Sequence, residues 1–321
     1  MSTNNPFATV ARLTQIALAV KPYGMIADLA APRVPVPDEE FVYTKFSTED
    51  RFTLTDTRIG RKSEPNQVEF GGTDVTASTE DRGLDDFVPQ KDLDRYSSGA
   101  TAIDPSATAV EGLAALVDLD REKKVADLYN TLTTFASSLR TTLSGTSQWS
   151  HASSTPVTAI MQAMDTMLVR PNVLICSREV FTALRTHAQV VAAVLGAAGV
   201  GAASGAAGVV SEMAMADLFG LQRILVGETF YNSAKPGQAA SYARLWGKHA
   251  TLARIDPAVR NVRGGAMPTF LATAEWQGRR TRIIPEPKRG IDGGNTYRVA
   301  EQIKELVLWQ EAAYHFHDAA A

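Results

Sequence analysis

Residues 104–145 read DPSATAVEGLAALVDLDREKKVADLYNTLTTFASSLRTTLSG, and this stretch predicts one long helix around which the rest of the chain is arranged. Asp104 is a favourable N-cap residue, and Pro105 suits the first helical position, where its missing N–H costs nothing. Apolar residues then recur at spacings of three and four up to Leu143, and Gly145 ends the helix. At about 1.5 Å per residue this helix would be on the order of 55 Å long. Because the stretch lacks the ordered flanking charges of a coiled coil, we expect a single helix packed along a sheet.

The residues at the start of the chain predict an arm and a strap. Residues 7–20 predict an amphipathic helix, because apolar residues recur there at helical spacing. The candidates for contact along its apolar stripe are Phe7, Val10, Leu13 and Ile16. Residues 32–37 contain three prolines, which favour an extended strap with few ladder hydrogen bonds of its own. We expect such a strap to lie across another surface.

Residues 41–96 predict a long hairpin. Apolar positions alternate at 52–54 and again at 68–70, on either side of a turn at 59–66. The faces of this hairpin are poorly hydrophobic, and an isolated two-stranded ribbon is only marginally stable in water. We therefore expect the hairpin to need a partner surface in order to stay ordered.

Charge is distributed unevenly along this hairpin. Residues 45–62 carry five basic and three acidic residues, whereas residues 74–94 carry two basic and seven acidic residues. A basic tip and an acidic base suit head-to-tail docking between copies of the chain, although two solvated loops would show the same pattern. The candidates for contact between subunits are Arg58, Arg61, Lys62, Glu80, Asp81, Asp85 and Asp86.

Residues 157–255 alternate between helix and strand patterns and predict a compact α/β domain. We expect helices over 157–168, 178–195 and 213–219, strands over 172–176 and 223–226, and a strand pair over 242–255. Between the helices, a stretch of Gly and Ala predicts a mobile surface loop with the glycines Gly196, Gly199, Gly201, Gly205 and Gly208. Long strands are then expected over 268–276, 280–285 and 296–309.

Composition excludes several classes of protein. Lys and Arg number 32 and Asp and Glu number 35, so the whole chain has no excess of positive charge for binding nucleic acid or a membrane surface. The single cysteine, Cys176, allows no internal disulfide and fits a reducing compartment. It sits in an apolar run, where a thiol is more often a core residue than a nucleophile. No run of about 18 apolar residues suggests a membrane span.

Catalytic and ligand-binding motifs are weak. The glycines near residue 200 follow a helix and are off the dinucleotide-binding spacing, and no Gly-x-Ser-x-Gly elbow occurs. His315 and His317 share one face of an expected strand, but no third metal ligand lies nearby in the sequence. We therefore expect no catalytic residue, no cofactor and no metal site. The strands near the C-terminus carry a basic cluster that could face DNA, although contact with another subunit is the favoured interpretation. The cluster consists of Arg279, Arg280, Arg282, Lys288 and Arg289.

The chain combines an arm, a strap, an unsupported hairpin and a long helix. These elements are more typical of a subunit in a repeating assembly than of a monomer. In their order and spacing the motifs of this chain resemble the major capsid proteins of tailed bacteriophages, which have the Hong-Kong-97-type coat fold. The resemblance runs from about residue 43 to the C-terminus. It is carried by TLTDTRIG at 53–60, GLDD at 83–86, DLDRE at 118–122, RPNVLI at 170–175, RTH at 185–187, LFGL at 218–221 and LWGKHA at 245–250.

The resemblance implies an α+β, Hong-Kong-97-like fold in several parts. We expect an N-terminal arm at 1–43, an extended loop at 44–96, a peripheral domain with the spine helix at 97–156, an axial α/β domain at 157–270 and returning strands at 271–321. The Gly-Ala stretch would lie near the centre of a capsomer.

The resemblance also implies a structural role and not an enzymatic one. The chain would assemble with itself into pentamers and hexamers that close an icosahedral or elongated shell, part of the virion, around packaged double-stranded DNA. Scaffolding, portal and cement proteins are the other expected partners, no membrane is involved, and assembly would take place in the cytoplasm of the host bacterium. Two alternatives stay open, namely an encapsulin-like compartment that holds protein cargo and a stand-alone α/β hydrolase or nucleotide-binding enzyme.

Overall fold

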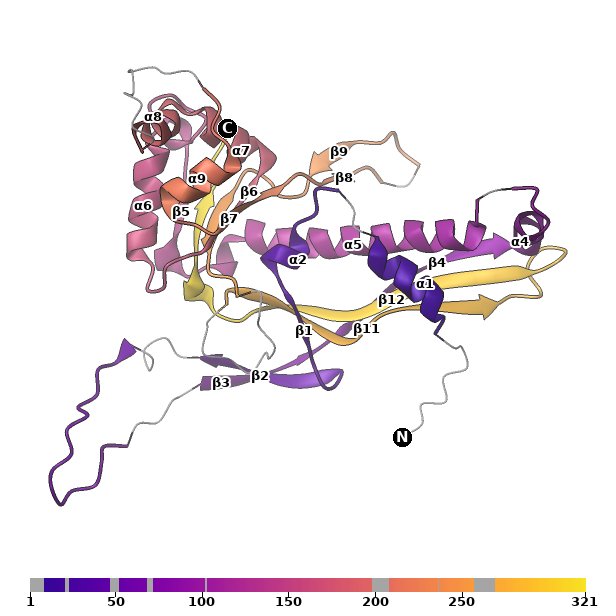
Figure 1. The fold of residues 1–321 in the computed structure, drawn as a ribbon, viewed down its shortest axis with the longest axis horizontal. Helices are drawn as coiled ribbons and strands as arrows, with labels where there is room; N and C mark the ends of the chain where they lie inside the picture. The colour runs from indigo at the N-terminus through magenta and orange to yellow at the C-terminus, as the bar shows by residue number, and fades with distance from the viewer. Residues whose placement is uncertain are drawn as a thin grey trace.

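The computed structural model has an elongated half and a broader half (Figure 1). It describes residues 9–20, 23–46, 52–67, 72–101, 103–197, 208–235, 237–256 and 269–321. In the elongated half, helix α5 (Pro105–Asn130) lies along a four-stranded sheet, and the broader half contains a five-stranded sheet covered by helices. None of the helices that the structure describes combines the length and the apolar character of a membrane-spanning segment.

Helix α5 begins where the sequence predicts but ends earlier. The carboxylate of Asp104 accepts hydrogen bonds from two backbone N–H groups of the first turn, those of Ser106 and Ala107. The predicted N-cap is therefore confirmed. The helix ends at Asn130 instead of near residue 145, so it is about 39 Å long. Apolar residues recur beyond this end because they are buried, although they are not in the helix. Phe135 packs in the cluster near the end of α5, and Leu139 packs in the core of the five-stranded sheet.

The four-stranded sheet has the order β1 (Arg33–Pro35), β11 (Leu271–Pro285), β12 (Gly294–Val307) and β4 (Glu80–Pro89). The Pro-rich strap does not lie across a separate surface, because it forms β1, a parallel edge strand of this sheet in which Val34 pairs with Ala274. An edge position tolerates proline because the missing N–H faces away from the ladder. Strand β4 pairs with β12 along its whole length, so this part of the expected extended loop belongs to the sheet.

The face of the sheet next to α5 also holds the N-terminal arm. Helix α1 (Ala11–Ala19) packs against α5 and β11, with Leu13 buried and Val10 and Ile16 partly buried in one apolar cluster. These arm candidates therefore contact their own chain, and Val10 and Ile16 keep part of their surface exposed. Phe7 lies outside the described residues.

The hairpin is formed by residues on either side of the expected strands. Strand β2 (Glu40–Phe46) pairs with β3 (Gly72–Ser78), whereas positions 52–54 are not in a strand and positions 68–70 lie outside the described residues. The base of the hairpin packs on its own sheet through Phe41 and Tyr43, which are buried with apolar residues of β1, β11 and β12. The expectation of a ribbon without support from its own chain is thus wrong for the base of the hairpin.

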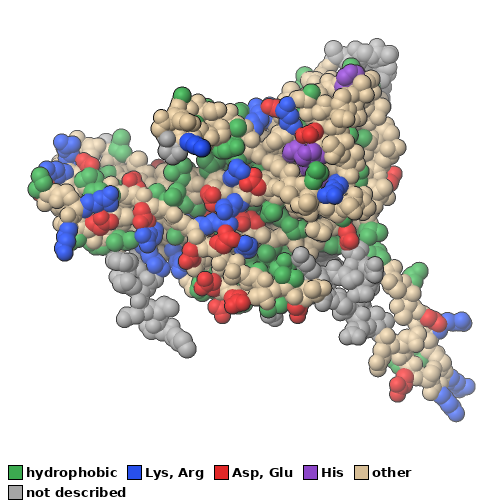
Figure 2. All heavy atoms as spheres, turned by 180° about the vertical axis from the view of Figure 1, so that it is seen from behind, with side chains coloured by type: hydrophobic (Ala, Val, Ile, Leu, Met, Phe, Trp, Pro, Cys, Tyr) green, Lys and Arg blue, Asp and Glu red, His purple; other side chains and the backbone are tan. Residues whose placement is uncertain are grey.

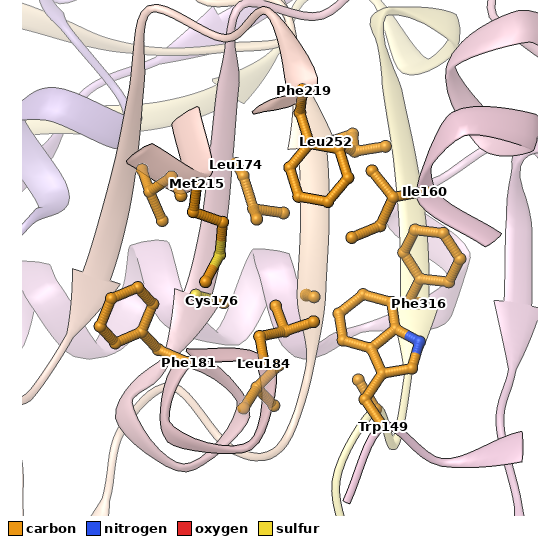
Figure 3. Packing of buried hydrophobic residues seen from close by; sticks show 14 of the residues in the cluster. Trp149, Ile160, Leu174, Cys176, Phe181, Leu184, Met215, Phe219, Leu252 and Phe316 are labelled. Atoms are coloured by element: carbon orange, nitrogen blue, oxygen red, sulfur yellow. The ribbon is translucent and has the colours of Figure 1, made fainter. Parts of the chain in front are cut away.

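The five-stranded sheet forms the broader half. Its order is β5 (Arg140–Thr142), β13 (Ala313–His317), β10 (Ala250–Ala253), β6 (Val173–Ser177) and β7 (Arg223–Gly227). The helices of this half are α6 (Pro156–Thr166), α7 (Arg178–Thr186), α8 (Ala188–Ala197) and α9 (Glu212–Phe219). One face of the sheet packs on these helices through a single hydrophobic core. The core residues labelled in Figure 3 are Trp149, Ile160, Leu174, Cys176, Phe181, Leu184, Met215, Phe219, Leu252 and Phe316.

Three details of this half differ from the sequence expectations. The helix expected over 178–195 is two helices, because His187 breaks it and accepts a hydrogen bond at Nδ1 from the backbone N–H of Gln189. The strand pair expected over 242–255 does not form, since β9 (Tyr242–Arg244) pairs with β8 (Phe230–Asn232) while β10 lies between β6 and β13. The strands expected over 268–285 are one strand, β11, with an irregularity between Trp276 and Arg280.

Candidate functional site

The segment between β2 and β3 is exposed along its whole described length, residues 52–67. We call it the exposed segment. It extends away from the rest of the chain (Figure 1), and Leu54 is 100% exposed while Phe52 and Ile59 are 52% and 61% exposed. Apolar side chains held in water gain no burial energy to offset the entropy of ordering the backbone. This arrangement is typical of a segment that is completed by another molecule.

The basic candidates lie in this exposed segment. The side chains of Arg58, Arg61 and Lys62 are all exposed. A local hydrogen bond runs from the backbone N–H of Arg58 to Asp56 (3.0 Å), and basic side chains project from the tip (Figure 2). The tip therefore presents positive charge beside exposed apolar groups.

The acidic candidates divide into two kinds. Hydrogen bonds from Lys304 and Arg82 lower the pKa of Glu80 to about 2, and a two-bond pairing with Arg298 (2.7 Å each) lowers the pKa of Asp85. These two carboxylates thus already have partners in their own chain. By contrast, two further acidic side chains of β4 are exposed and form no ion pair with any residue that the structure describes, Asp81 and Asp86.

A groove of about 940 Å³ opens beside these carboxylates, between β4, α4 (Gln90–Ser97) and the first turns of α5. Its lining contains the carboxylates Asp86 and Asp92, together with Asp85, which is already paired with Arg298, and the basic residue Arg95. Apolar residues of the lining include Ile103, Leu113 and Leu116. Ile103 and Leu116 are both largely exposed. The groove therefore combines negative charge with uncovered apolar surface, which complements the basic and apolar character of the exposed segment.

The basic cluster of the long strands is divided by burial. Arg279 is only 7% exposed and pairs with Asp118 and Glu301 under α5, so it cannot contact DNA or another subunit as the sequence suggested. Arg280 and Arg282 are half-buried, and Lys288 and Arg289 are exposed. Basic side chains gather at the end of the molecule where α4 meets the β11–β12 turn (Figure 2).

A buried carboxylate that the sequence did not single out fastens the N-terminal arm. Glu122 of α5 is 1% exposed and accepts hydrogen bonds from the backbone N–H groups of Ile26 (3.0 Å) and Ala27 (2.8 Å). It also accepts one from the indole of Trp246 (2.7 Å). Burial raises the pKa of Glu122, although these donors favour its charged form. The carboxylate caps the short helix α2 (Ala27–Ala30), whose own N-cap residue supplies no side-chain bond.

The glycine-rich stretch is only partly described. Gly196 lies in the last turn of α8, and Gly208 precedes α9; both are exposed. Gly199, Gly201 and Gly205 lie outside the described residues.

Three histidines meet where β10 and β13 lie side by side. His315 is buried, His249 and His317 are partly exposed, and one ligand atom of each lies within 4.8 Å of those of the other two. Burial and the neighbouring imidazoles lower the pKa of His315 to about 3, and burial lowers that of His249 to about 4. His249 is the third histidine of this cluster, and the sequence did not indicate that it lies beside the other two. Its distance from His315 along the chain hid it, because only the pairing of β10 with β13 joins them.

The buried thiol of Cys176 is part of the core, as expected. It is 1% exposed, and burial raises its pKa, which makes it a poor nucleophile.

Known proteins resemble this chain in sequence over its full length. The family model "Phage major capsid protein E" matches residues 108–222. The major capsid protein of Pseudomonas phage JBD67 is 40% identical over 319 residues, which cover 99% of each chain.

Solved structures resemble it in fold. A phage-related protein from Bordetella bronchiseptica RB50 has a TM-score of 0.75 at 20% identity, with 98% of each chain covered. The capsid protein of cyanophage P-SCSP1u has a TM-score of 0.57 at 10% identity, with 93% of this chain and 89% of that chain covered. The expected α+β, Hong-Kong-97-like fold is thereby confirmed.

An encapsulin also shares the fold. The encapsulin of Synechococcus elongatus PCC 7942 has a TM-score of 0.51 at 12% identity, with 94% of this chain and 89% of that chain covered. Identity this low reports the fold alone, whereas the relative from phage JBD67 is similar in sequence throughout.

Proposed function

This chain belongs to the family of phage major capsid proteins and forms the capsid shell, and we propose that its copies are joined by docking the exposed segment of one into the groove of the next. The shell is built from pentamers and hexamers of the chain. The observation that carries this proposal is the full exposure of residues 52–67, which includes three large apolar side chains.

Complementary chemistry supports the docking. The exposed segment offers Leu54 and Ile59 next to the positive charges at 58, 61 and 62, and the groove offers apolar Ile103 and Leu116 next to acidic residues. Asp81 and Asp86 add exposed negative charge on the adjoining strand. Exposed ion pairs contribute about 0–1 kcal/mol each, so the charges select the register and the apolar contacts supply most of the affinity.

Stability then belongs to the shell more than to the subunit. A contact that is weak in one pair is repeated around every capsomer, and copies bound to copies are stabilised by mass action. The five parts expected from the sequence are retained in this proposal with two changes. The expected peripheral part at 97–156 loses β5, which is an edge strand of the five-stranded sheet. The extended loop spans 44–78, because β4 is a strand of the long sheet.

Reversal of charge at the tip tests the docking. The triple variant Arg58→Glu, Arg61→Glu, Lys62→Glu is expected to yield a folded, soluble chain that forms no shells, as measured by sedimentation and negative-stain microscopy. The matched control Arg58→Lys, Arg61→Lys, Lys62→Arg keeps the charge and is expected to assemble normally.

A compensating exchange makes the test specific. Adding Asp81→Lys and Asp86→Lys to the charge-reversed chain restores attraction and is expected to recover part of the shell yield. Normal particles from the triple variant would refute the docking, and would leave the family assignment intact.

The remaining partners follow from the shell. The shell is a component of the virion, and we propose that it encloses double-stranded DNA without sequence specificity. It is assembled in the host cytoplasm with separate scaffolding and portal proteins, and cement proteins are an optional addition. The basic residues of β11 and of the turn after it are candidates for contact with DNA or with a neighbouring copy. They are the half-buried Arg280 and Arg282 and the exposed Lys288 and Arg289. Catalysis forms no part of this function. Nuclease-protected DNA in purified particles distinguishes a genome container from an encapsulin-like compartment.

A further inference from the structure

Three imidazoles converge on one face of the five-stranded sheet, away from the exposed segment and its groove. His315 and His317 are two residues apart in β13, and His249 directly precedes β10, which pairs with β13. Neutral imidazole is a common ligand of zinc and other divalent transition metals, and three such ligands with one open position form a frequent type of metal site. We propose that His249, His315 and His317 bind one divalent transition-metal ion of the Zn²⁺ class.

The spacing of two of the ligands already suits a metal. Nε2 of His315 lies 3.5 Å from Nδ1 of His317. Two nitrogens bound to one zinc ion at about 2.0–2.1 Å in tetrahedral geometry are about 3.3–3.4 Å apart. Without a metal, one ring can donate a hydrogen bond to the other across this distance, with the donor set by the tautomer. A cation bound to both nitrogens would take the place of that proton with little movement of either ring.

Neighbouring groups can orient these two rings for binding. Nδ1 of His315 lies 2.9 Å from the hydroxyl of Thr251, so its N–H can donate there and leave Nε2 free for the metal. Oδ2 of Asp318 lies 3.6 Å from Nε2 of His317, on the side of that ring away from His315. A carboxylate behind a ligating histidine fixes its tautomer and raises its basicity. The residue types and positions around the rings thus match those of a metal centre.

The third ring must turn to complete the site. The ring of His249 stacks on that of His317 with centroids 4.2 Å apart, and its Nδ1 accepts a hydrogen bond from the backbone N–H of Asp318 (3.1 Å). Binding exchanges this hydrogen bond for a metal bond. The absence of a side chain at Gly247 leaves room for the ring, since a Cβ there would lie 2.8 Å from Cδ2 of His249. A bound ion would tie the C-terminal strand to β10.

The test uses the full, untagged chain freed of metal with a chelator. Titration with ZnCl₂, followed by calorimetry and elemental analysis after desalting, is expected to give one ion per chain. His249→Ala and His317→Ala are each expected to weaken binding at least tenfold, and Asp318→Ala by about 10–100-fold, as for other outer ligands of metal sites. His151→Ala is the matched control, because this exposed histidine lies outside the cluster and bonds to Ser153. It is expected to bind as the unchanged chain does.

Two further readouts keep the result independent of folding defects. Visible absorption of the Co²⁺-loaded chain reports tetrahedral coordination by nitrogen, and it should disappear in His317→Ala but persist in His151→Ala. The circular dichroism spectrum of each variant establishes that it is folded. A chain that binds no ion at one equivalent, or folded His249→Ala and His317→Ala variants that bind as tightly as the control, would overturn the proposal.

Discussion

Substitution of Glu122 by alanine is expected to detach the N-terminal arm from the long helix. The carboxylate is buried and satisfies three donors, the backbone N–H groups of Ile26 and Ala27 and the indole N–H of Trp246. A buried donor left without a partner costs about 1–3 kcal/mol, so the loss of the acceptor of three donors costs about 3–9 kcal/mol. Loss of the buried charge itself returns part of this cost. We therefore expect the variant to lose about 3–5 kcal/mol of stability.

The assay combines two measurements on the unassembled chain. Urea unfolding followed by circular dichroism measures the change in the free energy of unfolding, and amide hydrogen exchange of a peptide containing Ile26 and Ala27 measures local opening. Exchange of these two amides is expected to accelerate in Glu122→Ala. Glu122→Gln keeps the shape but places an NH₂ group against the donors, so it is expected to lose about 1.5–3 kcal/mol, the strength of one hydrogen bond to a charged group.

The matched control is Glu111→Ala on the same helix. Glu111 is exposed, so its removal should change stability by no more than about 0.5 kcal/mol. A Glu122→Ala chain as stable as this control, with unchanged exchange at residues 26 and 27, would show that the carboxylate does not hold the arm.

Two further predictions concern β4. The folded-state pKa of Glu80 is about 2 against an ordinary value of 4.5. Its pairing with Lys304 therefore stabilises the fold above pH 4.5, and this stabilisation is lost as the pH falls from about 4.5 to about 2. Glu80→Gln should flatten the plot of melting temperature against pH over this range, and an unchanged acid profile would count against the pairing. Gly83→Ala should destabilise the chain by about 1–3 kcal/mol in urea unfolding, because a Cβ at this position would lie 2.8 Å from the Cβ of Ala300. Gly112→Ala, at an open position inside α5, should instead stabilise the chain by about 0.5–1 kcal/mol. Equal effects of the two substitutions would refute the close approach of β4 and β12.

Local signals in the sequence predicted the elements whose causes are local. The Asp104-Pro105 cap located the start of α5, and the apolar run around Cys176 located a buried strand. The end of α5 could not be found in this way. Apolar residues continue at helical spacing beyond Asn130, and only the fold shows that Phe135 and Leu139 face different cores.

The candidate site depended on features that are not local. Arg279 and Arg280 are neighbours of identical type, yet the first is buried in ion pairs under α5 and the second is half-buried, because successive side chains of β11 point to opposite faces and only the fold shows which face α5 covers. Likewise, charge along the sequence indicated that Asp85 was available to a partner, whereas the register of β4 against β12 places it opposite Arg298. The exposed tip at 58–62 was predictable, because a hydrophilic turn between weak strands has few ways to be buried.

The order of motifs along the chain carried the family assignment, which the full-length similarity to the capsid protein of phage JBD67 confirms. No single motif would have been sufficient. Phage capsids and an encapsulin share this fold, so the sequence relationship, and not the architecture, separates the two.

An electron cryomicroscopy reconstruction of assembled particles tests most directly whether copies of this chain complete one another. It is expected to show the side chains of Leu54 and Ile59 covered by Ile103 and Leu116 of the adjacent copy. A reconstruction in which these two side chains remain in solvent, or turn back onto the polypeptide that carries them, would contradict the account.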